Sequence, residues 1–107
     1  MAYSTDEEII AFGDIDGQGI LLEGEDYETL HEFEISGEKV TAIKFDKDSN
    51  NFIFGFDYNL QIIDSKGNEM VQIELSRVQG ALVDILVKQY QVYVISHKGN
   101  ISLYDLL

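Results

Sequence analysis

Short hydrophobic runs alternate with polar turns along most of the chain. Each run is rich in Val, Ile, Phe and Tyr, and the runs recur about every 8 to 12 residues. This spacing predicts an antiparallel all-β fold, because β-branched and aromatic residues favour strands and Gly, Asn and Asp favour the turns between them. The predicted strands after Lys39 are 40–45, 51–56, 60–63, 70–75, 82–87, 91–96 and 101–106.

The amino-terminal part is harder to assign from its pattern. The sequence STDEE could cap a short helix from Ser4 to Phe12, and this is the only helical signal in the chain. The repeat described next instead predicts a strand at Ile9–Phe12. The local pattern therefore allows a helix, whereas the repeat indicates a strand.

The strand and turn pattern repeats every 41 residues, the distance in sequence from Glu23 to Asp64 and from Asp64 to Asp105. The stretch GFDYNLQIID aligns without gaps with SHKGNISLYD, and DIDGQGILLE lies one period upstream. Each stretch ends in an acid after an apolar pair, and a polar turn residue precedes that acid at a constant distance. We interpret these six positions as structural turn residues: Asp16, Asp57 and Lys98 early in the unit, and Glu23, Asp64 and Asp105 at its end.

With this repeat the chain resembles the WD40 family of β-propellers, whose blades of about 40 residues hold four antiparallel strands. The best-matching unit is VTAIKFDKDSNNFIFGFDYNLQIID, with Val40, an aromatic residue at Phe45, Asp57 in the tight turn and Asp64 at the end. Ile63 stands where the family usually has Trp, and Ile35 and Ser36 stand where it has Gly-His. The resemblance implies four-stranded antiparallel blades of a partial propeller with about ten strands.

The resemblance also implies a domain organisation. A single domain would contain a blade part at 7–36, a blade at 37–76 and a blade part at 80–107, beginning on the second strand of a blade and ending on the third. Propellers of about four or more blades close into rings, so we expect such a chain to be completed by a partner chain or by self-association. An engineered or excised propeller fragment is the third explanation.

Charge is concentrated in the first third of the chain. Residues 1–38 contain twelve acidic side chains and no Lys or Arg, whereas the whole chain has a net charge of −13. Such a field repels nucleic acid and anionic membranes and attracts a basic protein surface. We expect partner contacts from backbone pairing at Ile9–Phe12 or Ile101–Tyr104 and from six side chains: Glu25, Asp26, Glu28, Tyr58, Tyr90 and Tyr93.

The stretch DIDGQGILLEGE offers a calcium-binding alternative. An EF-hand loop would take its oxygen ligands from Asp14, Asp16, Gln18, the Ile20 carbonyl and Glu25. An EF-hand also requires a helix on each side, and Gly24 stands where the exit helix would begin. A β-hairpin turn explains Asp16 and Gly17 without a metal, so we favour the hairpin and keep calcium binding as the alternative.

Catalytic chemistry has little support in the sequence. There is no Cys, the two histidines His31 and His97 are far apart in the chain, and GDIDGQG lacks the Lys of a phosphate-binding loop. The longest apolar runs are too short to cross a bilayer, and the amino terminus is acidic where a signal peptide would be basic. The sequence therefore predicts a cytoplasmic, non-enzymatic protein-interaction scaffold with no cofactor and no bound metal.

Overall fold

The computed structural model is built from β-strands, as the pattern predicts. It describes residues 2–4, 8–24, 26–35, 37–75, 80–88 and 90–105. The strands are β1 (Ala2–Tyr3), β2 (Ile9–Gly13), β3 (Gln18–Glu23), β4 (Thr29–Glu34), β5 (Val40–Asp46), β6 (Asn51–Phe56), β7 (Asn59–Asp64), β8 (Glu69–Glu74), β9 (Leu82–Lys88), β10 (Gln91–Ser96) and β11 (Ile101–Asp105).

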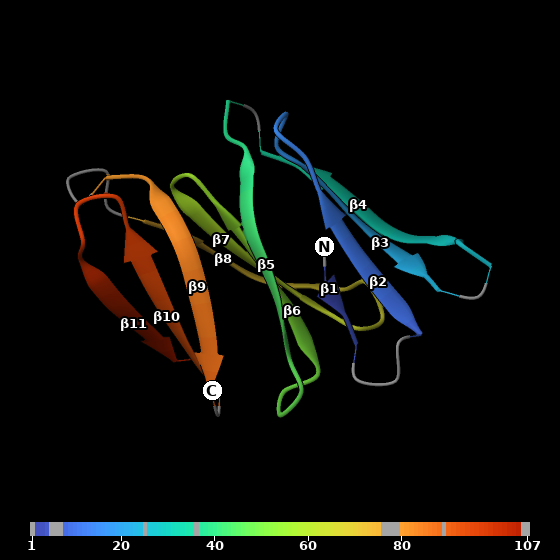
Figure 1. Ribbon diagram of the computed structural model, residues 1–107. Helices are drawn as coiled ribbons and strands as arrows, with labels where there is room; N and C mark the ends of the chain where they lie inside the picture. The colour runs from blue at the N-terminus through green and yellow to red at the C-terminus, as the bar shows by residue number, and fades with distance from the viewer. Residues whose placement is uncertain are drawn as a thin grey trace.

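These strands form three antiparallel sheets that stand side by side (Figure 1). The first sheet has the order β1-β2-β3-β4 and the second β5-β6-β7-β8, while the third contains β9, β10 and β11. Each sheet is a simple meander in which consecutive strands pair, because the short turns leave no room for a crossover. The predicted all-β fold of antiparallel blades is confirmed.

The helical alternative for Ser4–Phe12 is contradicted over Ile9–Phe12, whereas residues 5–7 lie outside the described residues. Residues Ile9–Gly13 form β2, and β1 pairs with it through Ala2 opposite Ala11 and Tyr3 opposite Ile10. The segment forms a strand despite its helix-capping sequence because Ala11 is fully buried against the second sheet, and this tertiary packing outweighs local helix propensity. The pattern also missed β1, because a strand of two residues is too short to show a period. The first sheet therefore has four strands, in the order β1-β2-β3-β4.

One detail of the repeat alignment needs correction. The third strands of the sheets keep the spacing of the sequence repeat, but Ile53 faces Ile62 in the second sheet while Tyr93 faces Leu103 in the third. The second strands are therefore offset by one residue relative to the gapless alignment. The cause is a turn at Asp57–Tyr58 that is one residue shorter: four residues separate the paired Gly55 and Leu60, whereas five separate Gly13 from Gly19 and Ile95 from Ile101.

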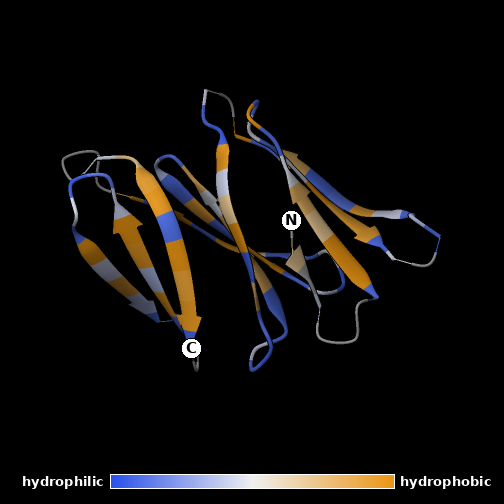
Figure 2. Ribbon diagram, in the orientation of Figure 1, coloured by the Kyte–Doolittle hydropathy of each residue, from blue (hydrophilic) through white to orange (hydrophobic). Residues whose placement is uncertain are grey.

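The hydrophobic core lies in two layers between the sheets. Strand residues alternate between the two faces of a sheet, so the second sheet contributes to both layers. Toward the first sheet it presents Phe52, Phe54, Phe56 and Ile63, which pack with Ala11 and Leu21. Toward the third sheet it presents Ile53, Leu60 and Ile62, which pack with Ile85, Val92 and Val94. Figure 2 shows that the hydrophobic residues lie mainly on the strands, where hydrophilic residues alternate with them.

Aromatic rings fix the contact between the first two sheets. Phe33 on β4 meets Phe54 edge-on with ring centroids 4.8 Å apart, and it meets Phe56 at 5.9 Å. Such edge-to-face pairs add about 0.5–1.5 kcal/mol each beyond the area they bury. The sheets therefore pack as a specific stack.

Candidate functional site

The turn between β2 and β3 is a hydrogen-bonded hairpin. The Asp14 N–H donates to the Gln18 carbonyl at 3.1 Å, and the Asp14 Oδ1 accepts from the backbone N–H groups of Asp16 and Gln18 at 3.0 and 2.9 Å. Gly17 has a φ of 84°, which this turn requires and which glycine adopts without strain. The side chain of Asp14 is thus committed to the turn itself.

Two other turns have the same construction. Asp64 and Asn68 close the turn between β7 and β8, with Asp64 Oδ1 accepting from the N–H groups of Lys66 and Asn68 at 2.9 and 2.8 Å. Ser96 and Asn100 close the turn between β10 and β11, where the Ser96 N–H donates at 3.0 Å. All three turns place a glycine with positive φ at the fourth position. DIDGQ, DSKGN and SHKGN are therefore one kind of hairpin turn.

This geometry overturns the calcium alternative. Residues 14–25 follow β2, contain β3 and precede β4, so strands stand where the two helices of an EF-hand would be. Gln18 and Ile20 lie within β3. Glu25 lies outside the described residues. Asp16 is exposed in the turn, and no group of three or more His, Cys, Asp or Glu side chains suited to a metal occurs in the described ranges. The acidic pattern arises from turn chemistry.

Partial burial acts to raise the pKa of Asp64, but its hydrogen bonds outweigh this effect. The backbone and side chain of Asn68 and the backbone N–H of Lys66 stabilise the carboxylate, and the charge of Lys66 adds to them. The pKa of Asp64 is consequently held below its ordinary value of 3.8. The lowered pKa favours the ionised form of Asp64, which is the form that accepts these hydrogen bonds.

The turns between second and third strands also tie one sheet to the next. The Val40 N–H at the start of β5 donates to the Asp14 carbonyl at 2.9 Å, and the Leu82 N–H at the start of β9 donates to the Asp57 carbonyl at 2.8 Å. Ile35 and Leu75, just after the fourth strands, donate to the carbonyls of Gly17 and Tyr58 at 3.0 and 2.8 Å. Successive sheets are therefore joined at this end by equivalent backbone bonds.

Acidic side chains strengthen the junction at the second turn. Glu38 accepts from the Tyr58 N–H and from Asn59 Nδ2, both at 2.6 Å, and the Lys39 N–H donates to Asp57 Oδ2 at 3.3 Å. Beside them lies an open hollow of about 510 Å³, lined by Ile15, Asp16, Gly37, Glu38, Lys39, Asp57, Tyr58 and Ala81. Because Asp57 and Glu38 already accept from the protein, the geometry here is that of a structural junction.

The remaining predicted turn residues lie at or next to strand ends. Lys98 is in the turn between β10 and β11, and Glu23, Asp64 and Asp105 are the last residues of β3, β7 and β11. This placement agrees with their spacing in the sequence. Their structural role stays a prediction.

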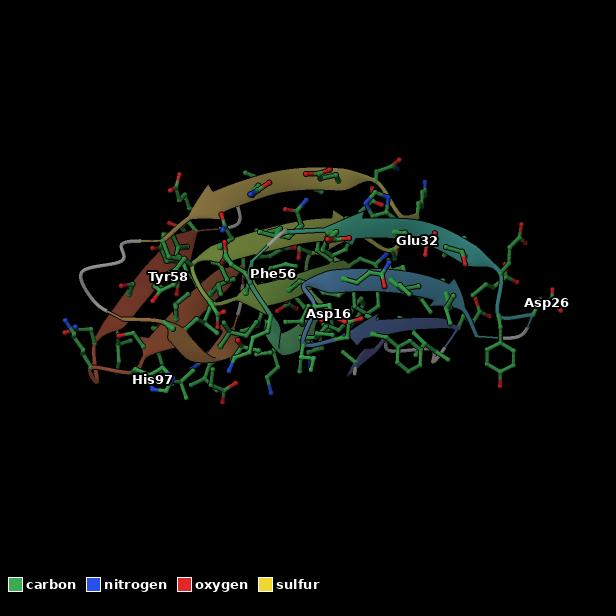
Figure 3. All side chains as sticks on the ribbon, turned by 90° about the horizontal axis from the view of Figure 1, so that it is seen from above. Asp16, Asp26, Glu32, Phe56, Tyr58 and His97 are labelled. Carbon is green, nitrogen blue, oxygen red and sulfur yellow. The ribbon has the colours of Figure 1, made fainter. Side chains whose placement is uncertain are left out.

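The predicted partner-binding side chains that the structure describes do not gather in one patch. Asp26 and Glu28 are exposed in the loop between β3 and β4, and Glu25 lies outside the described residues. Figure 3 shows Asp26 at the opposite end of the molecule from Tyr58. The Tyr90 hydroxyl donates to the Asp48 carbonyl at 2.8 Å. Of the three predicted tyrosines, Tyr93 belongs to a surface with an apolar character, and its role as a contact stays a prediction.

That surface is the side of the third sheet that faces away from the second. We name it the third-sheet end face. It contains three large exposed hydrophobic side chains, Leu86, Ile101 and Leu103, with exposed fractions of 52%, 69% and 52%. The residues paired with them on the same face are Tyr93, opposite Leu86 and Leu103, and Ile95, opposite Ile101.

The side of the first sheet that faces away from the second is the matching first-sheet end face. Ala11 and Leu21 point into the core, so their neighbours along the strands point outward. These neighbours are hydrophobic: Ile10, Phe12, Ile20 and Leu22. Glu32 and Glu34 on β4 lie on the same face, because they pair with Ile20 and Gln18. Phe12 is 37% exposed.

Sequence reasoning missed these end faces, although the repeat contained the signal. Ile101 and Leu103 lie one repeat period after Leu60 and Ile62, which are buried against the third sheet. The predicted exposed edge at Ile9–Phe12 also needs correction, because β1 pairs with part of β2. In the third sheet, β11 pairs only with β10 among the described strands, so Ile101–Asp105 is an edge.

Solved structures share this arrangement of sheets. The structure of U3-55K matches with a TM-score of 0.81 and 14% sequence identity over 98% of this chain. The carboxyl-terminal WD40 domain of Sif2 matches with a TM-score of 0.80 and 18% identity over 98% of the chain. The fold is that of a WD40-type propeller segment.

The chain spans 33% of the U3-55K structure and 33% of the Sif2 domain. A computationally designed protein, Ika4, matches over 92% of this chain and 61% of its own, with a TM-score of 0.78 and 18% identity. No protein-family model and no curated protein sequence matches the chain. Within the described part of this WD40-type segment, no helix is long and apolar enough to cross a membrane.

Proposed function

We propose that this WD40-type segment is a non-enzymatic protein-interaction scaffold that binds protein through its end faces. The observation that carries the proposal is the exposure of Leu86, Ile101 and Leu103 on the third-sheet end face. Contiguous exposed apolar surface on a soluble protein marks an interaction site. A protein that covers this face would bury side chains of the kind that the second sheet buries inside the chain.

Two further features would orient the bound protein. The β11 edge offers backbone N–H and C=O groups for pairing with an added strand, which contributes affinity with little side-chain selectivity. The acidic first third of the chain would favour a partner with a basic surface and raise the rate of association. Selectivity would then come from charge and from the shape of the apolar face.

The hydrogen bonds of the acidic side chains near the sheet junctions support a scaffold more than an enzyme. Glu38 and Asp57 accept hydrogen bonds from backbone N–H groups of each other's segments, at Tyr58 and Lys39, and Asp14 accepts from backbone N–H groups of its own turn. Carboxylates committed in this way hold sheets in place. The hollow lined by Glu38 and Asp57 is open and lies at this structural junction.

A matched pair of surface variants tests the proposal. Leu103→Glu places a charge on the third-sheet end face, whereas Met70→Glu places the same charge at a side chain of similar exposure, 59%, on β8 of the second sheet. Proteins captured by the wild-type chain would be purified and binding reconstituted with each variant. The proposal expects a partner that binds wild type and Met70→Glu equally and binds Leu103→Glu at least about 30-fold more weakly, as for a hot-spot residue.

Equal binding of a purified partner to all three proteins would contradict a role for this face. Circular dichroism of each variant serves as the folding control. Because Leu103 and Met70 are both exposed, neither change is expected to unfold the chain.

A further inference from the structure

The two end faces repeat the two kinds of surface that already meet inside the chain. In the second sheet, Ile53, Leu60 and Ile62 pack toward the third sheet. The equivalent positions of the third sheet, by strand register, are Tyr93, Ile101 and Leu103. The third-sheet end face is thus the repeat of a surface that packs against a following sheet.

The first-sheet end face repeats the opposite kind of surface. Phe52 pairs with Ile63, and Phe54 lies on the same face, which packs toward the first sheet. The equivalent residues of the first sheet are Ile10, Leu22 and Phe12, which pair in the same register. This end face therefore has the pattern of a surface that packs against a preceding sheet.

On the basis of the proposed function, we propose that the third-sheet end face of one chain binds the first-sheet end face of a second copy. This contact joins the same two kinds of surface as the contacts between the first and second and between the second and third sheets. Each copy has both end faces, so the third-sheet end face of the second copy can bind the first-sheet end face of the first copy. These two contacts close a ring.

Charge favours this head-to-tail pairing over a symmetrical contact between two acidic first-sheet end faces. A contact between two first-sheet end faces would set Glu32 and Glu34 against copies of themselves, which is unfavourable for like charges. The third sheet has Lys88 and Lys98 as well as Asp84 and Asp105. It is nearly neutral and accepts the acidic sheet without net repulsion.

The number of copies follows from the number of sheets. Propellers typically close with about four to eight blades, and the described residues of each copy of the 107-residue chain form three sheets. Two copies together supply a number of sheets within this range, whereas one copy falls below it and three copies exceed it. A head-to-tail contact of this kind either closes or grows into a filament, and we infer closure at two copies.

Sedimentation equilibrium of the 107-residue chain over a range of concentrations tests the inference. Wild type and the control Met70→Glu are expected to have twice the mass of the single chain. Leu103→Glu and Phe12→Glu, one on each end face, are each expected to raise the dissociation constant of the dimer by at least about 30-fold. Ile101→Glu, at a side chain that is 69% exposed, is the second third-sheet variant if Leu103→Glu does not fold.

The sign of the introduced charge gives a further control. Leu103→Lys should weaken the dimer less than Leu103→Glu, because the face it would meet carries Glu32 and Glu34. Equal weakening by both would contradict the head-to-tail pairing.

Three outcomes would overturn the inference. A wild-type chain that stays monomeric at all concentrations excludes the second copy, and if it then binds another protein through Leu103 the proposed function stands alone. A Phe12→Glu chain that remains dimeric shows that the first-sheet end face is not used. Masses that keep rising with concentration show a filament in place of a closed ring.

Discussion

Strands β7 and β11 occupy the same place in their sheets but differ in exposure. Leu60 and Ile62 on β7 have exposed fractions of 0% and 2%, whereas Ile101 and Leu103, one repeat later on β11, have 69% and 52%. The residues are of the same class and point to the same side of their sheets. The difference is that the third sheet covers β7, and no described residue covers β11 in the same way.

This comparison shows that burial here is decided by neighbours along the stack. The hydrophobic pattern of a repeat sets which face of a strand is apolar, and the presence of the next sheet sets whether that face reaches water. An end face with the pattern of an interior face is therefore a candidate interface.

Ile62→Ala on β7 and Leu103→Ala on β11 should differ most in their effect on the free energy of unfolding. Both would be measured by urea denaturation in a Phe12→Glu background, which we expect to keep the chain monomeric. Ile62→Ala should lower the free energy of unfolding by about 2–5 kcal/mol, because it leaves a cavity in the layer between the second and third sheets. Leu103→Ala should change it by less than about 0.5 kcal/mol. A similar loss for both would show that β11 is covered within the chain.

Gly17→Ala and Gly99→Ala compare the same kind of hairpin turn in two places: at Gly17 the chain leading into the second sheet packs on the turn, and at Gly99 no described atom does. Both glycines have positive φ, at 84° and 79°, so alanine adds backbone strain of about 1 kcal/mol in each case. At Gly17 a Cβ would also overlap the carbonyl oxygens of Ile35 and Glu38, whereas at Gly99 it would meet no described atom. We expect thermal denaturation to show a loss of about 2–4 kcal/mol for Gly17→Ala and only the smaller loss for Gly99→Ala. Equal losses would contradict the junction between the first and second sheets.

Asp64→Ala tests the turn that follows β7. Asp64 closes a turn, so its removal should lower the free energy of unfolding by about 1 kcal/mol near neutral pH. The pKa of Asp64 is lowered in the folded chain, so its contribution is present above the ordinary value of 3.8 and is lost as the pH falls through the folded-state value. The stability difference from wild type should therefore vanish in acid. Unfolding measured from neutral pH into strong acid checks this, and a difference that persists at the acid end would contradict it.

Much of the fold could be predicted from the sequence. The alternating runs identified the strands from β5 onward, and the regular repeat led to the propeller resemblance through Asp57 and Asp64. Local signals failed at the amino terminus, where the burial of Ala11 decides for a strand and β1 is too short to show a period. The repeat alignment slipped by one residue at Asp57–Tyr58, because turn length depends on backbone geometry that a gapless alignment ignores.

The candidate site was less predictable. Charge and exposed tyrosines suggested Asp26 and Tyr58, which lie at opposite ends of the molecule (Figure 3). The apolar end face was hidden in the sequence because Ile101 and Leu103 look like core residues, as their counterparts Leu60 and Ile62 are. Only the structure shows which repeat has a neighbour. The calcium alternative failed for a related reason, since turn aspartates and calcium ligands share a spacing but not a backbone.

The most direct test of the account is the solvent protection of methyl groups measured by NMR with a soluble paramagnetic agent. At dilutions where the chain is monomeric, the methyl groups of Ile101 and Leu103 should relax strongly while those of Leu60 and Ile62 stay protected. At concentrations where the dimer forms, Ile101 and Leu103 should become protected as well. Protection of all four in the monomer would contradict the uncovered end face, and exposure of Ile101 and Leu103 at every concentration would contradict its burial by a second copy.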